Sequence, residues 1–339
     1  MADIITDNNP VTLADFESLT NDKPIRSLMH TIRDYTPIFD QAVIQPGNDG
    51  FGDRGKIITT YPEGQLRAFN EGWDTEKVHG SDVRYRAGMM RTRSEVDRDL
   101  YNTRPAAERD AWRFRKDQGF MRGLARKVVK TMFYGSAAAD PRGVDGLGSI
   151  VTPANEAFAD RIINGGGTTA AKQTDIWLVN WDAEACFCFY PQNGSQAGLR
   201  VENMGEHYAF DANGKRFLAL ITEFAWDLGV ALYDPEKIVR IANIDTAKYS
   251  IQNNKGGGAA NLIDLMTQAI EMLPDDQTGR VAFYMNDAAR SVLRRQIVNK
   301  DNVLLNMDEV AGRKVLTFAG VPVHKVGTNI IPNNMNVLA

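Results

Sequence analysis

A run of nearly sixty residues, 46–103, limits the possible folds more than any other part of the chain. Eight glycines interrupt it, and it carries few large aliphatic side chains. Such a stretch cannot enclose a hydrophobic core of its own, because it offers too little apolar surface to offset the entropy of ordering it. Short polar strands at 56–61 and 82–85 predict an extended hairpin or loop. We therefore expect this segment to become ordered by lying on another surface.

The chain as a whole has the composition of an ordinary folded protein. It has 339 residues, of which 43% are hydrophobic and 24% charged, with a net charge of −4. No apolar run approaches the ~18 residues of a membrane helix, and the first residues lack the basic and apolar regions of a signal peptide. The two cysteines, Cys186 and Cys188, cannot form a disulfide framework. These features predict a protein that neither spans a membrane nor is exported, and that is made in a reducing cytoplasm.

Residues 1–46 form a polar arm with one short apolar helix face. Ile25, Leu28, Met29 and Ile32 fall at the spacing i, i+3, i+4, i+7 that places side chains on one side of a helix. A helix this short is marginal alone, because nucleation is costly. We expect it to dock on the body of the protein or on a neighbour.

The pattern from 105 to 134 predicts a long helix, with Thr103 as its N-cap and Gly135 just beyond its end. At 1.5 Å per residue it would be roughly 45 Å long, which suits a spine rather than a small core element. The surrounding region is basic: residues 84–130 contain fourteen Lys or Arg and six Asp or Glu, although the whole chain is acidic. Another part of the molecule, or of its partner, is therefore correspondingly negative.

The remaining sequence predicts two further units. Strand patterns dominate 175–244, and one of them, 216–233, is far longer than the usual five or six residues. It indicates a long, narrow sheet. After the glycine triplet 256–258, two amphipathic helices alternate with short strands, which is typical of a compact α+β unit. We expect a boundary near residue 250 and an α+β fold class overall.

Residue types that carry chemistry are sparse and scattered. The four histidines are isolated from one another, so the sequence offers almost nothing from which to build a zinc site. Glu95, Asp97 and Asp99 could present carboxylates for acid–base work or for a cation. The competing interpretation, which we favour, is that they pair with arginines such as Arg93 and Arg98. We predict no catalytic residue, cofactor or metal, and keep a carboxylate-dependent hydrolase of unknown substrate as the alternative.

The basic stretch 84–130 also raises the possibility of nucleic-acid binding through phosphates. Its arginines are interleaved with acids, however, and its aromatic residues lack the signature of a stacking module. We therefore do not expect sequence-specific recognition of nucleic acid.

Distinctive segments follow one another along the second half of the chain. A turn after the spine helix reads Val144-Asp145-Gly146-Leu147, and the further segments are 174–181, 190–199, 203–206, 226–229, 239–245, 284–286 and 320–323. In this order they resemble the major capsid (coat) proteins of tailed bacteriophages, which have the Hong Kong 97-type fold and a similar Phe-Asp-Gly-Leu turn. The similarity is greatest to the coat proteins of short-tailed phages and covers about 103–330.

This resemblance implies a division of the chain into functional parts. It implies an N-terminal arm (1–46), an extended loop (47–102), a peripheral domain with the spine helix (103–254), an axial domain (255–316) and a C-terminal strand that returns to the peripheral domain (317–339). Such subunits form pentamers and hexamers of an icosahedral shell around double-stranded DNA. The implied partners are further copies of the chain, the portal protein, the enclosed DNA without sequence-specific binding, and scaffolding and cementing or decoration proteins where a phage has them. The implied location is the virion, after assembly in the host cytoplasm.

A structural subunit of this kind needs contact residues rather than an active site. A basic extension on an acidic subunit gives head-to-tail electrostatic complementarity, which can close into rings. The candidate subunit-contact residues are the apolar face of the arm and the charged side chains that follow the extended loop. They are Ile25, Leu28, Met29, Ile32, Arg84, Arg86, Arg91, Arg93, Glu95, Asp97 and Asp99.

Overall fold

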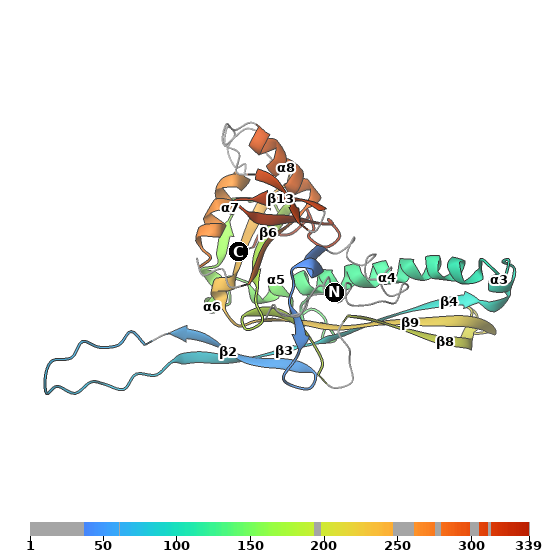
Figure 1. The fold of residues 1–339 in the computed structure, drawn as a ribbon, viewed down its shortest axis with the longest axis horizontal. Helices are drawn as coiled ribbons and strands as arrows, with labels where there is room; N and C mark the ends of the chain where they lie inside the picture. The colour runs from blue at the N-terminus through green and yellow to red at the C-terminus, as the bar shows by residue number, and fades with distance from the viewer. Residues whose placement is uncertain are drawn as a thin grey trace, which may run out of the picture.

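The computed structural model describes residues 37–60, 62–192, 198–246, 261–274, 279–298, 305–310 and 313–338. The helix expected around residues 25–32 lies outside these ranges. Figure 1 shows a central body from which a hairpin extends on one side, while a long helix and long strands extend on the other. Two helices, α7 and α8, lie at the far side of the body from the hairpin.

The helices and 3-10 turns are few and mostly short. They are η1 (Pro37–Asp40), α3 (Arg98–Asn102), α4 (Arg109–Tyr134), α5 (Leu147–Ile150), α6 (Glu156–Ala159), η2 (Pro235–Lys237), α7 (Leu262–Glu271) and α8 (Asp287–Val298). The described strands form three sheets. They are β1 (Ile44–Pro46), β2 (Gly52–Thr60), β3 (His79–Arg86), β4 (Gly88–Asp97), β5 (Ile162–Asn164), β6 (Gln173–Trp181), β7 (Cys186–Tyr190), β8 (Leu199–Phe210), β9 (Arg216–Leu232), β10 (Ile238–Asp245), β11 (Arg280–Asn286), β12 (Leu305–Val310), β13 (Arg313–Phe318) and β14 (Val321–Val326).

The glycine-rich segment is an extended hairpin, as predicted. Strands β2 and β3 pair antiparallel from Gly52 opposite Arg86 to Thr60 opposite His79. Beyond them the chain continues through residues 62–78 without regular structure, and each of these residues is exposed. The hairpin therefore projects from the body without contributing a core of its own (Figure 1).

A long sheet lies beneath the spine helix. The predicted long strand is β9, which pairs with β4 on one side and with β8 and β7 on the other. Helix α4 covers the face of this sheet that carries Phe224, whose ring lies 6.4 Å from that of Phe120. Strand β4 was not predicted, because its alternating arginines looked like a solvated basic stretch. Its intervening side chains Ser94 and Val96 are buried, as a half-buried strand requires.

The start of the spine helix was predicted wrongly. Thr103 is not its N-cap but the C-cap of the separate short helix α3, whose N-cap is Asp97. The Asp97 carboxylate accepts hydrogen bonds from two backbone N–H groups and begins α3 there, so α4 starts only at Arg109. Its end was predicted correctly, since Gly135 is the C-cap.

The third sheet joins segments from both sides of residue 250. Its order is β12-β13-β14-β11-β6-β10-β5. Strand β6 is buried along its whole length: Trp177, Val179 and Trp181 belong to the core under α4. Ile176 and Leu178 belong to the second core, under α7 and α8. One strand thus links the two larger hydrophobic cores, a pairing that local periodicity does not reveal.

A buried histidine gives this fold a pH dependence. His324 on β14 is 8% exposed, and its ring stacks on Tyr284 with the centroids 5.5 Å apart. Burial, aided by the charge of Arg290, lowers the pKa of His324 from 6.5 to about 4. In the unfolded chain His324 binds a proton with a pKa near 6.5, whereas in the folded chain it binds that proton only near pH 4. The free energy of unfolding therefore decreases as the pH falls from 6.5 to 4.

The expected loss at pH 4 approaches about 3 kcal/mol, at about 1.4 kcal/mol for each unit of pKa difference. A His324→Phe variant keeps an aromatic ring without the titrating group and should lose less stability over this range. Urea unfolding of the unassembled subunit at pH 7.5, 6, 5 and 4 measures the difference. Equal losses in both proteins would contradict the prediction.

Candidate assembly surfaces

The hairpin is clamped to the body at its base. The Tyr85 hydroxyl on β3 donates a hydrogen bond to the Leu232 carbonyl at 2.6 Å, and the Tyr233 hydroxyl donates to Asp53 on β2. Burial raises the pKa of both tyrosines well above the ordinary value, so both hydroxyls remain protonated donors. A side chain at Gly55 would lie 2.3 Å from the Tyr233 ring, so only glycine permits this approach. The direction of the hairpin is therefore set by packing at its base.

The far end of the hairpin, which we call the tip (residues 62–78), presents apolar side chains to solvent. Leu66 and Phe69 are fully exposed and Trp73 is 68% exposed. The Arg67 guanidinium lies 5.2 Å from the centre of the Trp73 ring. The backbone N–H of Gly64 donates to the Glu76 carboxylate, which links the two sides of the tip. The tip thus displays large apolar groups on an ordered frame, which is typical of a surface that binds a partner.

Charged side chains of β4 and β9 pair across the long sheet. Arg91 bonds both carboxylate oxygens of Asp227, and Arg93 bonds Glu223 on the adjacent strand. Glu95 lies 3.6 Å from Arg93. The acids of the two cross-strand pairs belong to β9 and were not among the predicted ones. Of the predicted acids, Glu95 pairs with Arg93 on its own strand, as the favoured interpretation expects.

The other predicted contact residues are separated from this ladder. Arg84 lies on the hairpin, where its Nε is 2.6 Å from the Asp49 carboxylate, and Arg86 is exposed on the same strand. Asp97 caps α3, and Asp99 lies 3.6 Å from Arg98. The structure therefore distributes the predicted set between the hairpin and the long sheet. The arm residues of that set, Ile25, Leu28, Met29 and Ile32, lie outside the described residues.

The described residues assemble no catalytic chemistry around the carboxylates proposed for a hydrolase. Glu95 and Asp97 are engaged in an ion pair and a helix cap. Within the described ranges, no group of three or more His, Cys, Asp or Glu is arranged to hold a metal ion. Cys186 and Cys188 are buried, and burial raises the pKa of both thiols. As predicted, they lie in the core, beside the buried aromatic rings of β7.

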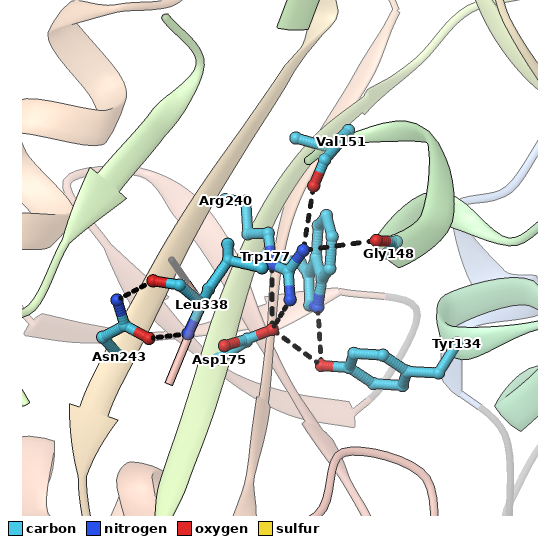
Figure 2. A network of polar contacts seen from close by, with 8 residues as sticks. All are labelled: Tyr134, Gly148, Val151, Asp175, Trp177, Arg240, Asn243 and Leu338. Carbon is cyan, nitrogen blue, oxygen red and sulfur yellow. Dashed lines mark hydrogen bonds and ion pairs between the residues drawn. The ribbon is translucent and has the colours of Figure 1, made fainter. Parts of the chain in front are cut away.

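A buried polar network fixes the spine helix to the body (Figure 2). Arg240 on β10 donates from two nitrogens to Asp175 on β6, and from a third to the Val151 carbonyl at 2.8 Å. Its guanidinium lies 4.9 Å from the centre of the Trp177 ring. Tyr134, the last residue of α4, donates to Asp175 and accepts from the Trp177 indole. Hydrogen bonds from three elements therefore converge on one ion pair.

A cleft between α4 and the beginning of β4 was not predicted from the sequence. Its volume is about 510 Å³, and Leu124, Lys127 and Lys130 from α4 line it together with Met89 from β4. The two lysines belong to the basic stretch that composition revealed. The only further sequence signal for the cleft was that both lysines fall on one side of the predicted helix. The tip was not predicted as a site either. Its signal in the sequence was the presence of Leu66, Phe69 and Trp73, which besides Val78 are the only large apolar residues of this polar segment.

Among the described residues, no helix combines the length and apolar character that crossing a membrane requires.

Two kinds of comparison with known proteins found matches, one with a family model and one with solved structures. A model of the major capsid protein GP7 family matches residues 20–335. A chain in the cryo-EM structure of bacteriophage Epsilon15 is 25% identical, with 88% of each chain covered and a TM-score of 0.65. A chain of the bacteriophage JBD30 capsid is 10% identical, with 86% of this chain and 90% of that chain covered and a TM-score of 0.49. No curated protein sequence matches.

The family match spans nearly the whole chain, including the hairpin, the spine helix, the long sheet and the seven-stranded sheet. The resemblance that the sequence motifs indicated is therefore confirmed, and so is the Hong Kong 97-like α+β fold. The role of the protein is structural, in the virion. The chain belongs to the major capsid protein GP7 family and is a coat protein of a tailed bacteriophage.

Proposed function

We propose that this coat protein assembles into pentamers and hexamers of an icosahedral shell that encloses double-stranded DNA. The observation that carries the proposal is the exposed tip of the hairpin, with Leu66 and Phe69 fully exposed at the end of a clamped extension. Monomeric proteins rarely keep such groups in water, whereas a neighbouring subunit would cover them. Because the hairpin leaves one side of the body and the long sheet the other, a head-to-tail contact uses two different surfaces and can close into a ring (Figure 1).

The charge distribution supports this arrangement. Residues 62–78 carry four carboxylates and two basic side chains, whereas residues 84–130 carry fourteen basic and six acidic ones. Complementary surfaces of this kind orient subunits during assembly. The overall negative charge also disfavours tight binding to packaged DNA, which has to leave the shell later.

We further propose the functional parts that the sequence predicted: arm 1–46, extended loop 47–102, peripheral domain 103–254, axial domain 255–316 and C-terminal strand 317–339. In this proposal the axial domain gathers around five-fold and six-fold axes. The portal protein, the enclosed DNA, and scaffolding or decoration proteins are proposed partners, and assembly takes place in the host cytoplasm. The proposed contact residues are those of the arm face, Arg84 and Arg86 on the hairpin, and the charged residues from Arg91 to Asp99.

The test is negative-stain imaging of the purified full-length protein, with sedimentation over a range of protein and salt concentrations. We expect uniform shells or rings of five and six subunits, with a yield that changes with salt because charged surfaces take part. A protein that stays a monomer or dimer under every condition would overturn the proposal.

A further inference from the structure

We propose that Gln173, Asn243 and Asn286 form a binding site for the main chain of an extended peptide, and that residues 332–338 of the protein occupy this site as a detachable segment. We call this segment the latch. Its release would free the first turn of helix α8 while both larger hydrophobic cores stay intact. The inference goes beyond the proposed shell function, and it can be tested on the unassembled subunit.

The latch is held through its backbone. Gln173 and Met335 exchange two backbone hydrogen bonds of 3.1 and 2.9 Å, which form an isolated antiparallel bridge to the first residue of β6. The Asn243 side-chain amide bonds both backbone groups of Leu338 (Figure 2). Its Oδ1 accepts from the Leu338 N–H at 2.7 Å, and its Nδ2 donates to the Leu338 carbonyl at 2.9 Å. Because these contacts use main-chain atoms, they suit an extended peptide whatever its side chains.

The backbone at Asn243 has an unusual conformation at this contact. Its φ of 56° lies in the left-handed region, which asparagine adopts more readily than most residues other than glycine. The residue lies where the pairing of β10 with β6 is irregular, between Ile241 and Ile244. Such conformations cost free energy and concentrate at sites that hold a ligand or a mobile segment. Here the group that is held is the latch.

The latch contributes no buried side chain. None of residues 332–338 is buried, and Val337 is 39% exposed. The buried anchors precede it, since Ile330 and Ile331 are 3% and 0% exposed and belong to the core under α4. Detaching the latch therefore breaks a few hydrogen bonds and leaves the core packing in place. Such a local opening requires far less free energy than unfolding the whole chain.

One asparagine connects the latch to α8. The Oδ1 atom of Asn286 accepts from the Ala289 backbone N–H at 2.8 Å, the contact of an N-cap at the start of the helix. Its Nδ2 donates to the Asn333 side chain at 2.5 Å and to the Thr174 hydroxyl at 2.7 Å. When the latch leaves, the Asn286 amide loses Asn333 and is free to rotate out of its capping position. The first turn of α8 should then open more often, which in the proposed shell would loosen the axial domain.

Hydrogen–deuterium exchange of the unassembled subunit tests the latch. Asn243→Gly removes the amide but keeps a residue that adopts positive φ without strain. We expect exchange roughly tenfold faster in the latch and in residues 289–292, with exchange in β9 unchanged. Asn70→Gly is the matched control, because Asn70 also has a positive φ but is exposed on the tip. It should change none of these rates.

A reversible lock supplies a second readout. Gln173 and Met335 are directly opposed, and such a hydrogen-bonded pair has its Cα atoms ~5.5 Å apart, within disulfide range. In Gln173→Cys with Met335→Cys, oxidation should slow exchange of the latch and of residues 289–292, and reduction should reverse the effect. Adding Asn243→Gly to the oxidised form should no longer speed exchange of α8. The native cysteines are buried and should not interfere.

Adding the latch as a separate peptide tests the binding site itself. A chain that ends at Ile331 keeps the buried anchors and lacks the latch. A synthetic peptide of residues 332–338, at millimolar concentration, should restore slow exchange of residues 289–292 in this truncated protein. The same peptide N-methylated at Met335 and Leu338 lacks the two N–H groups that the site accepts, and it should have no effect.

Three results would overturn the inference. Unchanged exchange of α8 in both Asn243→Gly and the truncated chain would show that the latch does not hold this helix. Equal acceleration in β9 would show that the segment only contributes to the stability of the whole fold. A methylated peptide as effective as the unmodified one would show that the site does not bind the main chain. None of these measurements requires assembly, so this inference and the proposed function can fail separately.

Discussion

Deleting residues 61–78 and joining β2 to β3 through an Asn-Gly turn is expected to abolish shells while leaving the subunit folded. Thr60 and His79 are opposite each other in the hairpin, so a two-residue turn can connect them without changing the register. Residues 62–78 are all exposed and contribute nothing to either hydrophobic core. The deletion therefore removes a surface for neighbours without removing core packing.

Imaging should show no shells, and the melting temperature of the unassembled subunit should stay within a few degrees of the wild type. A finer variant, Leu66→Ser with Phe69→Ser and Trp73→Ser, keeps the length of the tip and should also fail to assemble. Its control changes three polar residues of the same tip, Gln65, Thr75 and Lys77, to Ser and should form shells. Normal shells from the deletion variant would show that the tip is dispensable.

The features that the sequence predicted well depend on local composition and periodicity. The hairpin was predictable because a glycine-rich, aliphatic-poor stretch has few alternatives to an extended form. Strand β9 was predictable because apolar residues alternate from Leu218 to Trp226 and no turn residue pair interrupts its 17 residues. The end of α4 was predictable because Gly135 follows an apolar helical face. In each case the signal lies within the element itself.

The features that were missed depend on partners distant in sequence. The arginines of β4 look like a solvated surface until Asp227 and Glu223 lie beside them, 130 residues or more along the chain. The burial of β6 on both faces needs α4 on one side and α7 with α8 on the other. The cleft needs the beginning of β4 against the C-terminal half of α4. None of these pairings leaves a local period that sequence inspection can find.

The candidate contact residues remain predictions for the same reason. Their partners would belong to other copies of the chain, so neither periodicity nor intrachain geometry identifies them. What the structure adds is their grouping, with Arg84 and Arg86 on the hairpin and the residues from Arg91 to Asp99 on β4 and α3. The two groups can therefore be tested separately by charge reversal.

The substitution with the largest expected effect on stability is Arg240→Met. The side chains of Arg240 and Asp175 are 4% and 2% exposed, and their ion pair is joined by the Val151 carbonyl and the Tyr134 hydroxyl. Replacing Arg240 leaves a buried carboxylate without its cation, which typically costs about 3–5 kcal/mol. Urea unfolding of the unassembled subunit should show a loss of this size.

A double variant separates two contributions to the free energy of unfolding: the cost of an unpaired buried charge and the net stabilisation by the ion pair. Arg240→Met with Asp175→Leu removes both charges, and it should recover a large part of the stability that the single variant loses. As a matched control, Arg142→Met breaks the exposed pair with Asp140 and should leave the free energy of unfolding unchanged within error. If the double variant were as unstable as the single one, the loss would come from the severed contacts to Val151 and Tyr134. In that case the network would act mainly by holding the end of α4 against the sheet, and the single variant should also assemble poorly at temperatures where it is still folded.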